Sequence, residues 1–178
     1  MGRTDKRTCI YTLMKMLQPM GKVFVVTSNR QYCRLLEDGS NYGQYQNITI
    51  FVTDDTADEL WLHDEINRED YDHVILDNLY NEETDVLLYI QGAGVEVLDE
   101  DIVETFADEM ITIHMGKGSM KGKNNVPYSK DLMANLETVE YYKKLVCPSP
   151  AMGQVLSKIM ADKLGMSAKN LLKVVTKK

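Results

Sequence analysis

The residues best able to do chemistry stand at the start of the sequence, in the stretch MGRTDKRT. Gly2, Lys6 and Thr8 are residue types that phosphate-binding loops use at comparable positions. In such loops glycine lets backbone N–H groups approach the phosphates, lysine neutralises their charge and a hydroxyl group coordinates Mg²⁺. These three residues are therefore candidates for binding phosphate groups.

The rest of the sequence offers no comparable set. The three histidines are scattered, and the three cysteines form no CxxC or Cys/His cluster, so neither a zinc site nor a disulfide framework is predicted. Two acidic pairs, Asp54 with Asp55 and Asp99 with Asp101, have the oxygen ligands that divalent ions prefer. Both lie near expected helix starts, where the helix dipole favours acidic residues. We therefore predict no metal site.

Short apolar runs predict the strands that would position the candidate residues. The clearest is KVFVVT, residues 22–27, a continuous run of the kind found in strands buried on both faces. Further strands are expected at residues 47–53, 71–77 and 110–115. Residues 83–92 contain an apolar run that fits a helix or a strand equally well.

Apolar residues at helical spacing predict a first helix within residues 8–21, which Pro19 and Gly21 end. Residues 38–47 are rich in turn formers, and residues 116–125 form a basic, glycine-containing loop. The other expected helices cover residues 29–38, 56–66, 98–109, 128–146, 150–165 and 167–178.

The alternation of strands and helices indicates βαβ units. The predicted fold class is α/β, with three layers in which helices flank a mostly parallel sheet. Residues 1–126 would form this α/β domain. Residues 127–178 would form a helical, basic C-terminal segment that packs on the same domain or extends it.

Charge is strongly segregated along the chain, whose net charge is −7. Residues 1–53 carry seven Lys or Arg against three Asp or Glu, and residues 54–109 carry one against twenty. Residues 110–178 carry twelve against four. Such a distribution acts on association with partners more than on the fold. The acidic block would repel nucleic acid or attract the basic tail of a second copy.

The C-terminal helices combine an apolar face with many lysines. The simplest interpretation is a helix that packs on the sheet and turns its lysines to solvent. The alternatives are docking on an acidic protein, including a second copy of this chain, and binding to nucleic-acid phosphates. The lysines that would make these contacts are Lys158, Lys163, Lys169 and Lys173.

No apolar run approaches the ~18 residues that a transmembrane helix requires. The N-terminus also lacks the uninterrupted apolar region of a secretory signal peptide. The sequence therefore predicts a cytoplasmic protein without a transmembrane segment.

Three segments together resemble the ParA/MinD-type ATPases, the deviant Walker A class that includes partitioning and pilus-localisation proteins. That family opens with KGGxGKTT, and MGRTDKRT matches it at Gly2, Lys6 and Thr8. Its next element is DxDxQ-like, and here VFVVTSNRQ keeps the glutamine but has Thr27 and Asn29 at the aspartate positions. The third is an apolar strand ending in aspartate, here YDHVILD.

The resemblance covers roughly residues 1–115 and also includes ADEMITIHM, which is similar to a later strand of the family. It implies a P-loop-like α/β fold with ATP and Mg²⁺ as ligands. It also implies that Asp77 is the carboxylate at the end of the third segment. In the family a central strand runs into the phosphate loop, and since no residues precede Met1 to form it here, we expect either that this strand is lost or that the alignment is accidental.

The departures from the family pattern affect catalysis. Asp5 would repel phosphates, Arg7 replaces the Mg²⁺-coordinating hydroxyl, and Met1 replaces the signature lysine. Thr27 and Asn29 cannot act as the carboxylate that positions the attacking water. The resemblance therefore implies a non-catalytic relative, a pseudo-ATPase that works in assembly, positioning or scaffolding through protein contacts.

Two other functions remain open from the sequence. One is an active, weak ATPase that binds nucleotide with Lys6, Thr8 and Asp77. The other is an accessory protein that binds nucleic acid through the basic C-terminal helices.

Overall fold

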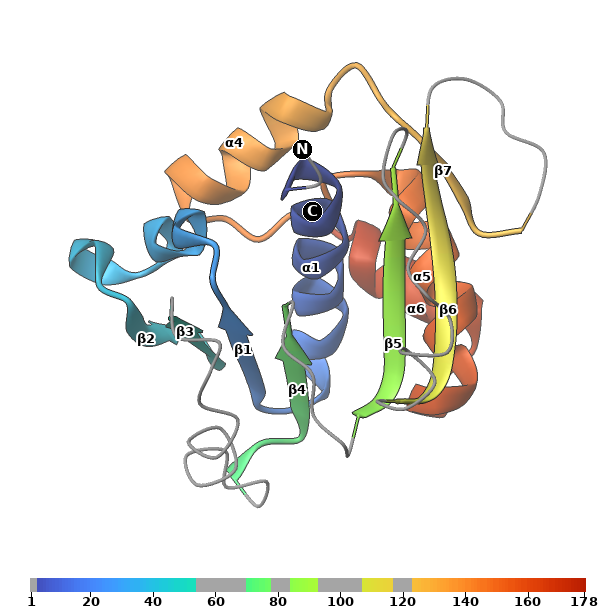
Figure 1. The fold of residues 1–178 in the computed structure, drawn as a ribbon, viewed down its shortest axis with the longest axis horizontal. Helices are drawn as coiled ribbons and strands as arrows, with labels where there is room; N and C mark the ends of the chain where they lie inside the picture. Colours follow the sequence, from blue (N-terminus) through green and yellow to red (C-terminus); the bar gives the residue numbers. More distant parts are fainter. Residues whose placement is uncertain (1–2, 54–69, 78–83, 93–106, 117–122) are drawn as a thin grey trace.

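The computed structural model describes residues 3–53, 70–77, 84–92, 107–116 and 123–178. In these residues two β-sheets lie on either side of an N-terminal helix, with further helices around them (Figure 1). The fold class is α/β, as the sequence predicted.

Sheet A has the strand order β2-β3-β1-β4. Its central strand β1 is buried at every position and pairs in parallel with β3 on one side and β4 on the other. β2 pairs antiparallel with β3 and forms a hairpin with it. The bounds are β1 Val23–Thr27, β2 Tyr42–Tyr45, β3 Ile48–Val52 and β4 His73–Leu76.

The three expected strands of sheet A are confirmed, but β2 lies in the stretch expected to consist of turns. Its two tyrosines favour a strand but Gly43 and Gln44 do not, so its pairing with β3 must hold it, in the register Tyr45 opposite Ile48. The preceding segment forms two short 3₁₀ helices, η2 at Arg30–Leu35 and η3 at Glu37–Gly39.

Sheet B has the order β5-β6-β7 and is parallel throughout. The ambiguous segment 83–92 forms strand β5, Thr84–Gln91. β6, Ala107–Gly116, begins earlier than expected, so residues 107–109 are a strand and not the end of a helix; Thr84 of β5 pairs opposite Ala107. β7, Asn125–Pro127, lies in and just beyond the expected basic loop and pairs with the end of β6.

Helix α1, Arg3–Leu17, begins five residues earlier than the predicted helix. Lys6 and Thr8 are therefore helical residues, which corrects the expectation that they belong to a loop. A 3₁₀ turn η1, Gln18–Met20, follows, and Gly21 then turns the chain with a φ of 140°. A side chain at that position would collide with the carboxylate of Asp72, which accepts a hydrogen bond from the backbone of Lys22 at 2.8 Å.

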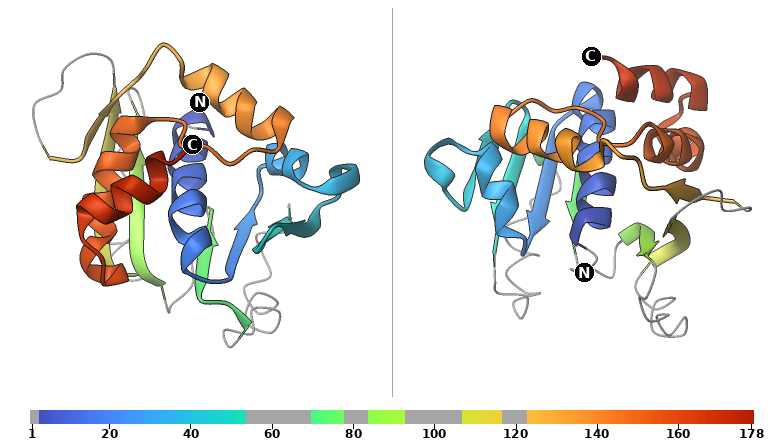
Figure 2. Two further views of the ribbon diagram at one scale, coloured as in Figure 1. Left: turned by 180° about the vertical axis from the view of Figure 1, so that it is seen from behind. Right: turned by 90° about the horizontal axis from the view of Figure 1, so that it is seen from above.

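Three C-terminal helices were expected and are present: α4 Leu132–Tyr142, α5 Pro150–Leu164 and α6 Ala168–Thr176. Ser149 and Ser167 cap the starts of α5 and α6 by accepting backbone hydrogen bonds. Gly165, with φ 64°, ends α5 in the left-handed conformation. α5 and α6 lie beside α1 and cover a face of sheet B (Figure 2).

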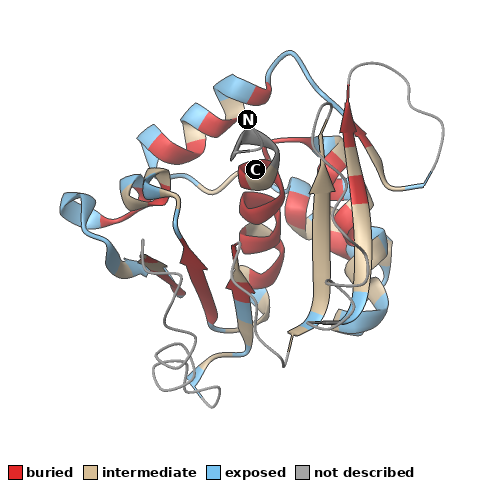
Figure 3. Cartoon of the chain, in the orientation of Figure 1, coloured by how far each residue is buried: buried red, intermediate tan, exposed pale blue. Residues whose placement is uncertain are grey.

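The larger of two hydrophobic clusters in the described residues joins these elements, and the smaller one contains Phe24 and Val26 of β1. α1 is buried along most of its length, and so is β1 (Figure 3). The core combines side chains of α1 with Val23 and Val25 of β1, Leu136 of α4, Leu156 of α5 and Leu171 of α6. The C-terminal helices therefore pack into the same core as the α/β elements.

The expected helix at 56–66 and most of the one at 98–109 lie outside the described residues. None of the helices in the described part of the chain combines the length and the apolar character that crossing a bilayer requires.

Candidate functional site

The candidate site lies at the carboxyl ends of strands β1 and β4. β1 ends at Thr27, and Asp77 directly follows β4. Because the two strands are neighbours and parallel, these residues reach the same edge of sheet A. The first turns of α1 bring Lys6 to that edge. Ligands of open α/β sheets bind outside this edge, so the position suits a binding site.

Lys6, Thr27 and Asp77 contact one another directly. The Lys6 ammonium lies 3.1 Å from Oδ1 of Asp77, and the Thr27 hydroxyl donates to Oδ2 at 2.7 Å. The Asp77 side chain is only 4% exposed, whereas that of Lys6 is 33% exposed. Both carboxylate oxygens of a nearly buried aspartate are thus engaged, and the lysine keeps access to solvent.

The loop after β1 continues this network. The backbone N–H of Asn29 donates to the Thr27 hydroxyl at 3.0 Å, so the hydroxyl is both donor and acceptor. The Asn29 side chain accepts from the backbone of Gln31 at 3.1 Å and caps η2. Thr27 and Asn29, which stand where the ParA/MinD-type pattern has aspartates, therefore hold the conformation of this loop.

Of the other candidates, Thr8 is fully buried and Gly2 lies outside the described residues. The next residue, Cys9, is also buried. Burial, and secondly the charge of Asp77, raise the pKa of the Cys9 thiol to about 12. A thiol held neutral in this way is a packing group rather than a nucleophile.

A second charged cluster, which sequence reasoning missed, surrounds Glu140 of α4. Arg7 donates to Oε1 of Glu140 at 2.5 Å, and the Tyr11 hydroxyl donates to the same oxygen at 3.2 Å. Arg34 of η2 lies 3.4 Å from Oε2, and its guanidinium also stands over the ring of Tyr141 at 5.2 Å. Glu140 therefore connects α1, η2 and α4.

The Arg7–Glu140 pair at the centre of this cluster is sealed from solvent, whereas the Arg34 side chain is 47% exposed. The side chains of Arg7 and Glu140 are 8% and 3% exposed. Burial, and secondly the charge of Glu140, raise the pKa of the Tyr11 hydroxyl far above its ordinary value. Burial also raises the pKa of Tyr32, whose ring lies 5.1 Å from that of Tyr11. No sequence signal marked Glu140, because an acidic residue within a helix is usually solvated.

The described residues do not fit Mg·ATP in the way that the ParA/MinD-type family binds it. The Thr8 hydroxyl is buried, Lys6 is paired with Asp77, and Arg7 is directed to Glu140. In the described part of the chain, no group of three or more His, Cys, Asp or Glu side chains could hold a metal ion.

A cavity of about 500 Å³ lies further along the same edge of sheet A, between η2 and the end of β3. Arg30, Cys33 and Val52 contribute to its lining, and neither Lys6 nor Asp77 does.

The lysines predicted to bind a partner lie on α5 and α6, and all four are exposed. Lys163 forms an ion pair with Glu109 of β6. Lys158 lies on the same helix, and Lys169 and Lys173 lie on α6. The structure thus places these lysines away from the Lys6–Asp77 edge.

Comparison of the chain with models of known protein families, with curated proteins and with solved structures finds no match. The resemblance to ParA/MinD-type ATPases stays a prediction from the sequence.

Proposed function

We propose that this chain is a non-catalytic relative of the ParA/MinD-type ATPases, a pseudo-ATPase that works in assembly or positioning through protein contacts. The observation that carries the proposal is the Lys6–Asp77 ion pair, with the Thr27 hydroxyl on the second carboxylate oxygen. The groups that an ATPase would direct to phosphate and metal are engaged with one another.

Binding a nucleotide would require several rearrangements. Lys6 would have to leave Asp77, which would then be a nearly buried carboxylate without its cation. Thr8 would have to turn out of the core. Arg7 could not assist, because its departure would leave Glu140 buried without its main partner. These costs together favour a site that holds α1 on the sheet.

The surface supports a role in protein contacts. α4 exposes Met133, Tyr141 and Tyr142, and other exposed aromatic residues are Tyr42 and Tyr128. Tyrosine and methionine are enriched at protein interfaces, where large side chains provide contact area. Segregated charge adds attraction between unlike surfaces at low ionic strength.

Calorimetry with Mg·ATP and Mg·ADP tests the closed site. We expect no binding at millimolar nucleotide, for the wild type and for Lys6→Ala alike. Light scattering coupled to gel filtration, at low and high salt, tests assembly. We expect species larger than the monomer at low salt, and their dissociation as salt screens the charges. A monomer under both conditions would count against self-assembly.

One observation favours a second candidate, a nucleotide-binding ATPase. Lys6, Thr27 and Asp77 meet at the edge where α/β sheets bind ligands. Micromolar binding of Mg·ATP that is lost in Lys6→Ala would support it and overturn the pseudo-ATPase proposal.

A nucleic-acid role would use exposed Lys158, Lys169 and Lys173. It predicts binding to duplex DNA or RNA that falls steeply with salt and weakens when these lysines are replaced. The large negative charge of residues 54–109 opposes it, so we rank it third.

A further inference from the structure

The C-terminal part of the chain carries positive charge that it does not neutralise. Residues 141–178 contain eight lysines and one acidic residue, Asp162. Lys173 lies in the last turn of α6, Lys177 directly follows the helix, and both are exposed. Side chains four residues apart on a helix are neighbours, so these two charges repel each other. Neither has an acidic partner among the described residues.

Tertiary structure brings two more lysines to the same place. The Lys15 ammonium of α1 donates a hydrogen bond to the backbone carbonyl of Lys177, and the C-terminus lies beside α1 (Figure 2). Burial lowers the pKa of Lys15; Cys147 acts in the opposite direction, and the charge of Lys144 lowers the pKa further. Lys144, two residues beyond α4, is therefore close to Lys15. Lys15, Lys144, Lys173 and Lys177 thus form one lysine cluster.

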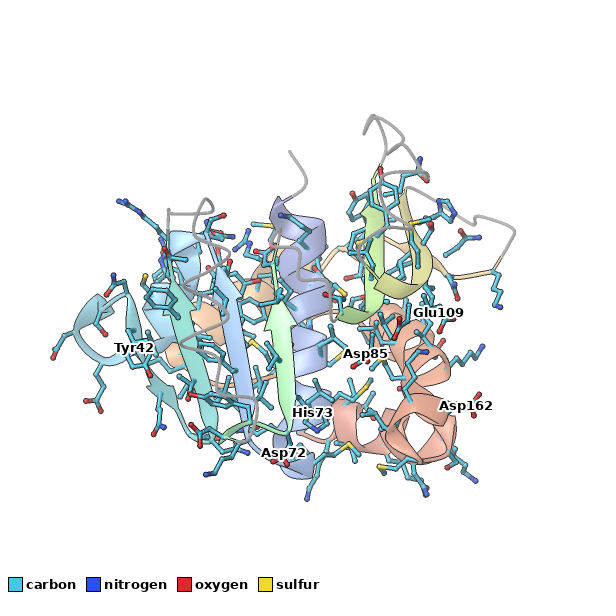
Figure 4. The ribbon with its side chains drawn as sticks, turned by 60° about the horizontal axis from the view of Figure 1, so that its bottom comes forward. Tyr42, Asp72, His73, Asp85, Glu109 and Asp162 are labelled. Carbon is cyan, nitrogen blue, oxygen red and sulfur yellow. The ribbon has the colours of Figure 1, made fainter. Side chains whose placement is uncertain are left out.

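Sheet B carries the complementary negative charge. β5 and β6 pair in parallel, with Thr84 opposite Ala107, so the next residues along the strands, Asp85 and Asp108, are side by side. Both are exposed, and Figure 4 shows Asp85 and Glu109, the residue after Asp108, near the starts of the two strands. Neighbouring strands lie about 4.8 Å apart, so the carboxylates of Asp85 and Asp108 repel each other. In the part of the chain that the structure describes, neither has a basic partner.

The lysine cluster and the two aspartates lie on opposite sides of the molecule. Leu88 of β5 and Ile113 of β6 face the core that α1, α5 and α6 share. Side chains alternate along a strand, and Asp85 and Asp108 are an odd number of residues from these two, so they face the outer side of sheet B. Figure 2, in the view from above, places α5 and then α6 on the other side of that sheet. The lysine cluster of one chain therefore does not neutralise its own two aspartates.

We propose that copies of this chain associate head to tail, with Asp85 and Asp108 of one copy docked on the lysine cluster of the next. This one contact relieves the repulsion on both surfaces, which is why a second copy fits better than an unrelated acidic protein. Because the two surfaces differ and face opposite ways, the contact is heterologous and repeats from copy to copy, into a filament or a closed ring. It rests on the assembly role proposed above and does not involve the Lys6–Asp77 pair.

The test is sedimentation velocity of the full chain over a range of concentrations, at low and at high salt. We expect species larger than a dimer at low salt and the monomer at high salt, because salt screens exposed charges. Two variants reverse the charge of one surface each: Lys173→Glu with Lys177→Glu, and Asp85→Lys with Asp108→Lys. Each variant alone should raise the dissociation constant at least about tenfold at low salt.

Mixing the two variants tests the direction of the contact. An equimolar mixture should assemble again, because both the altered and the unaltered surfaces of one variant complement those of the other. The matched control for the lysine variant is Lys123→Glu with Lys130→Glu, two exposed lysines outside the cluster that change the net charge equally. This control should assemble as the wild type does. The midpoint of urea denaturation shows whether each variant is folded.

Four results would overturn the proposal. A wild type that stays monomeric at low salt would exclude the contact, while nucleotide binding would still decide the pseudo-ATPase proposal separately. Assembly that stops at a dimer at every concentration would show an isologous interface. Folded variants that assemble as the wild type does would show that other surfaces meet. Folded variants whose mixture stays monomeric would show that the aspartates do not face the lysines.

Discussion

Lys6 and Arg7 are consecutive residues of α1, yet they pair with carboxylates in different surroundings. Lys6 keeps a third of its side chain in solvent while it binds Asp77 at the edge of sheet A. Arg7 and Glu140 are both almost completely buried, and Tyr11 and Arg34 complete the set of donors to Glu140. The first pair lies partly open to solvent at the edge of the sheet, whereas the second is enclosed between helices.

The difference shows that charge type alone does not identify a binding site. Both clusters join a basic residue of α1 to an acid distant in the sequence. The Asp77 cluster lies where parallel strands end and ligands can enter. The Glu140 cluster lies between α1, η2 and α4, so its interactions stabilise the packing of those elements.

The largest effect is expected from breaking the sealed pair. Glu140→Gln removes the charge that compensates Arg7 and should lower the free energy of unfolding by about 3 kcal/mol, measured by urea denaturation. Glu137→Gln, on the exposed side of the same helix, is the control and should change it by less than about 0.5 kcal/mol. A loss below about 1 kcal/mol at Glu140 would show that the pair is hydrated in solution.

The double variant Arg7→Met with Glu140→Leu sharpens the same point. Replacing both charges by apolar groups should recover much of the stability lost in the single variant, because no buried charge is left uncompensated.

The next effect concerns pH. Two groups of α1, the Cys9 thiol and the Tyr11 hydroxyl, have raised pKa values. Burial is the larger cause in both, and the second cause is the charge of Asp77 for Cys9 and of Glu140 for Tyr11. Because the folded-state pKa is raised, each group stabilises the fold fully below its unfolded pKa, and that stability is lost as pH rises. Stability should therefore fall between pH 9 and about 12 through Cys9.

Each such group changes the free energy of unfolding by at most about 1.4 kcal/mol per pH unit. Cys9→Ala should reduce the slope of unfolding free energy against pH, measured in reducing buffer. Ile10→Val, a buried change without a titrating group, should lower stability and leave the slope intact. Identical slopes in wild type and Cys9→Ala would mean that the thiol ionises as readily folded as unfolded.

The sequence was informative where the local pattern decides the structure. The strand KVFVVT is apolar throughout, and α5 and α6 have Ser149 and Ser167 as caps, so these elements could be predicted. The start of α1 could not be predicted, because it depends on residues distant in the sequence. Lys6 contacts Asp77, 71 residues away, and Arg7 contacts Glu140, 133 residues away. β2 could not either, since it depends on its pairing with β3.

The candidate site was predicted in part. Lys6 and Asp77 came from the resemblance, and the structure brings them into contact. Thr8 has the hydroxyl group that a phosphate site would use. It lies two residues after Lys6 on the helix, however, so it faces the core and not the edge where Lys6 lies. Glu140 looked like any acid on a helix, and only the tertiary structure shows what it contacts.

A smaller effect is expected from the open pair. Lys6→Met should cost about 2 kcal/mol of unfolding free energy, less than Arg7→Met, because it leaves the nearly buried Asp77 carboxylate with the Thr27 hydroxyl as a donor, whereas solvent already reaches Lys6. Lys130→Met, an exposed lysine outside the cluster, is the matched control. Equal losses for Lys6→Met and Arg7→Met would remove the distinction between an open and a sealed pair.

The smallest effect is expected at the ion pair of Lys163 with Glu109, in which the acid is 51% exposed, whereas Asp77 is 4% exposed. Lys163→Met should change the unfolding free energy by at most about 0.5 kcal/mol, since solvent weakens the attraction and ordering two long side chains opposes it. Urea denaturation at low and high salt measures this. The pairs of Glu140, Asp77 and Glu109 differ in how far they are buried, and the more deeply buried pairs should contribute more to the unfolding free energy. A loss at Lys163 as large as that at Lys6 would contradict this order.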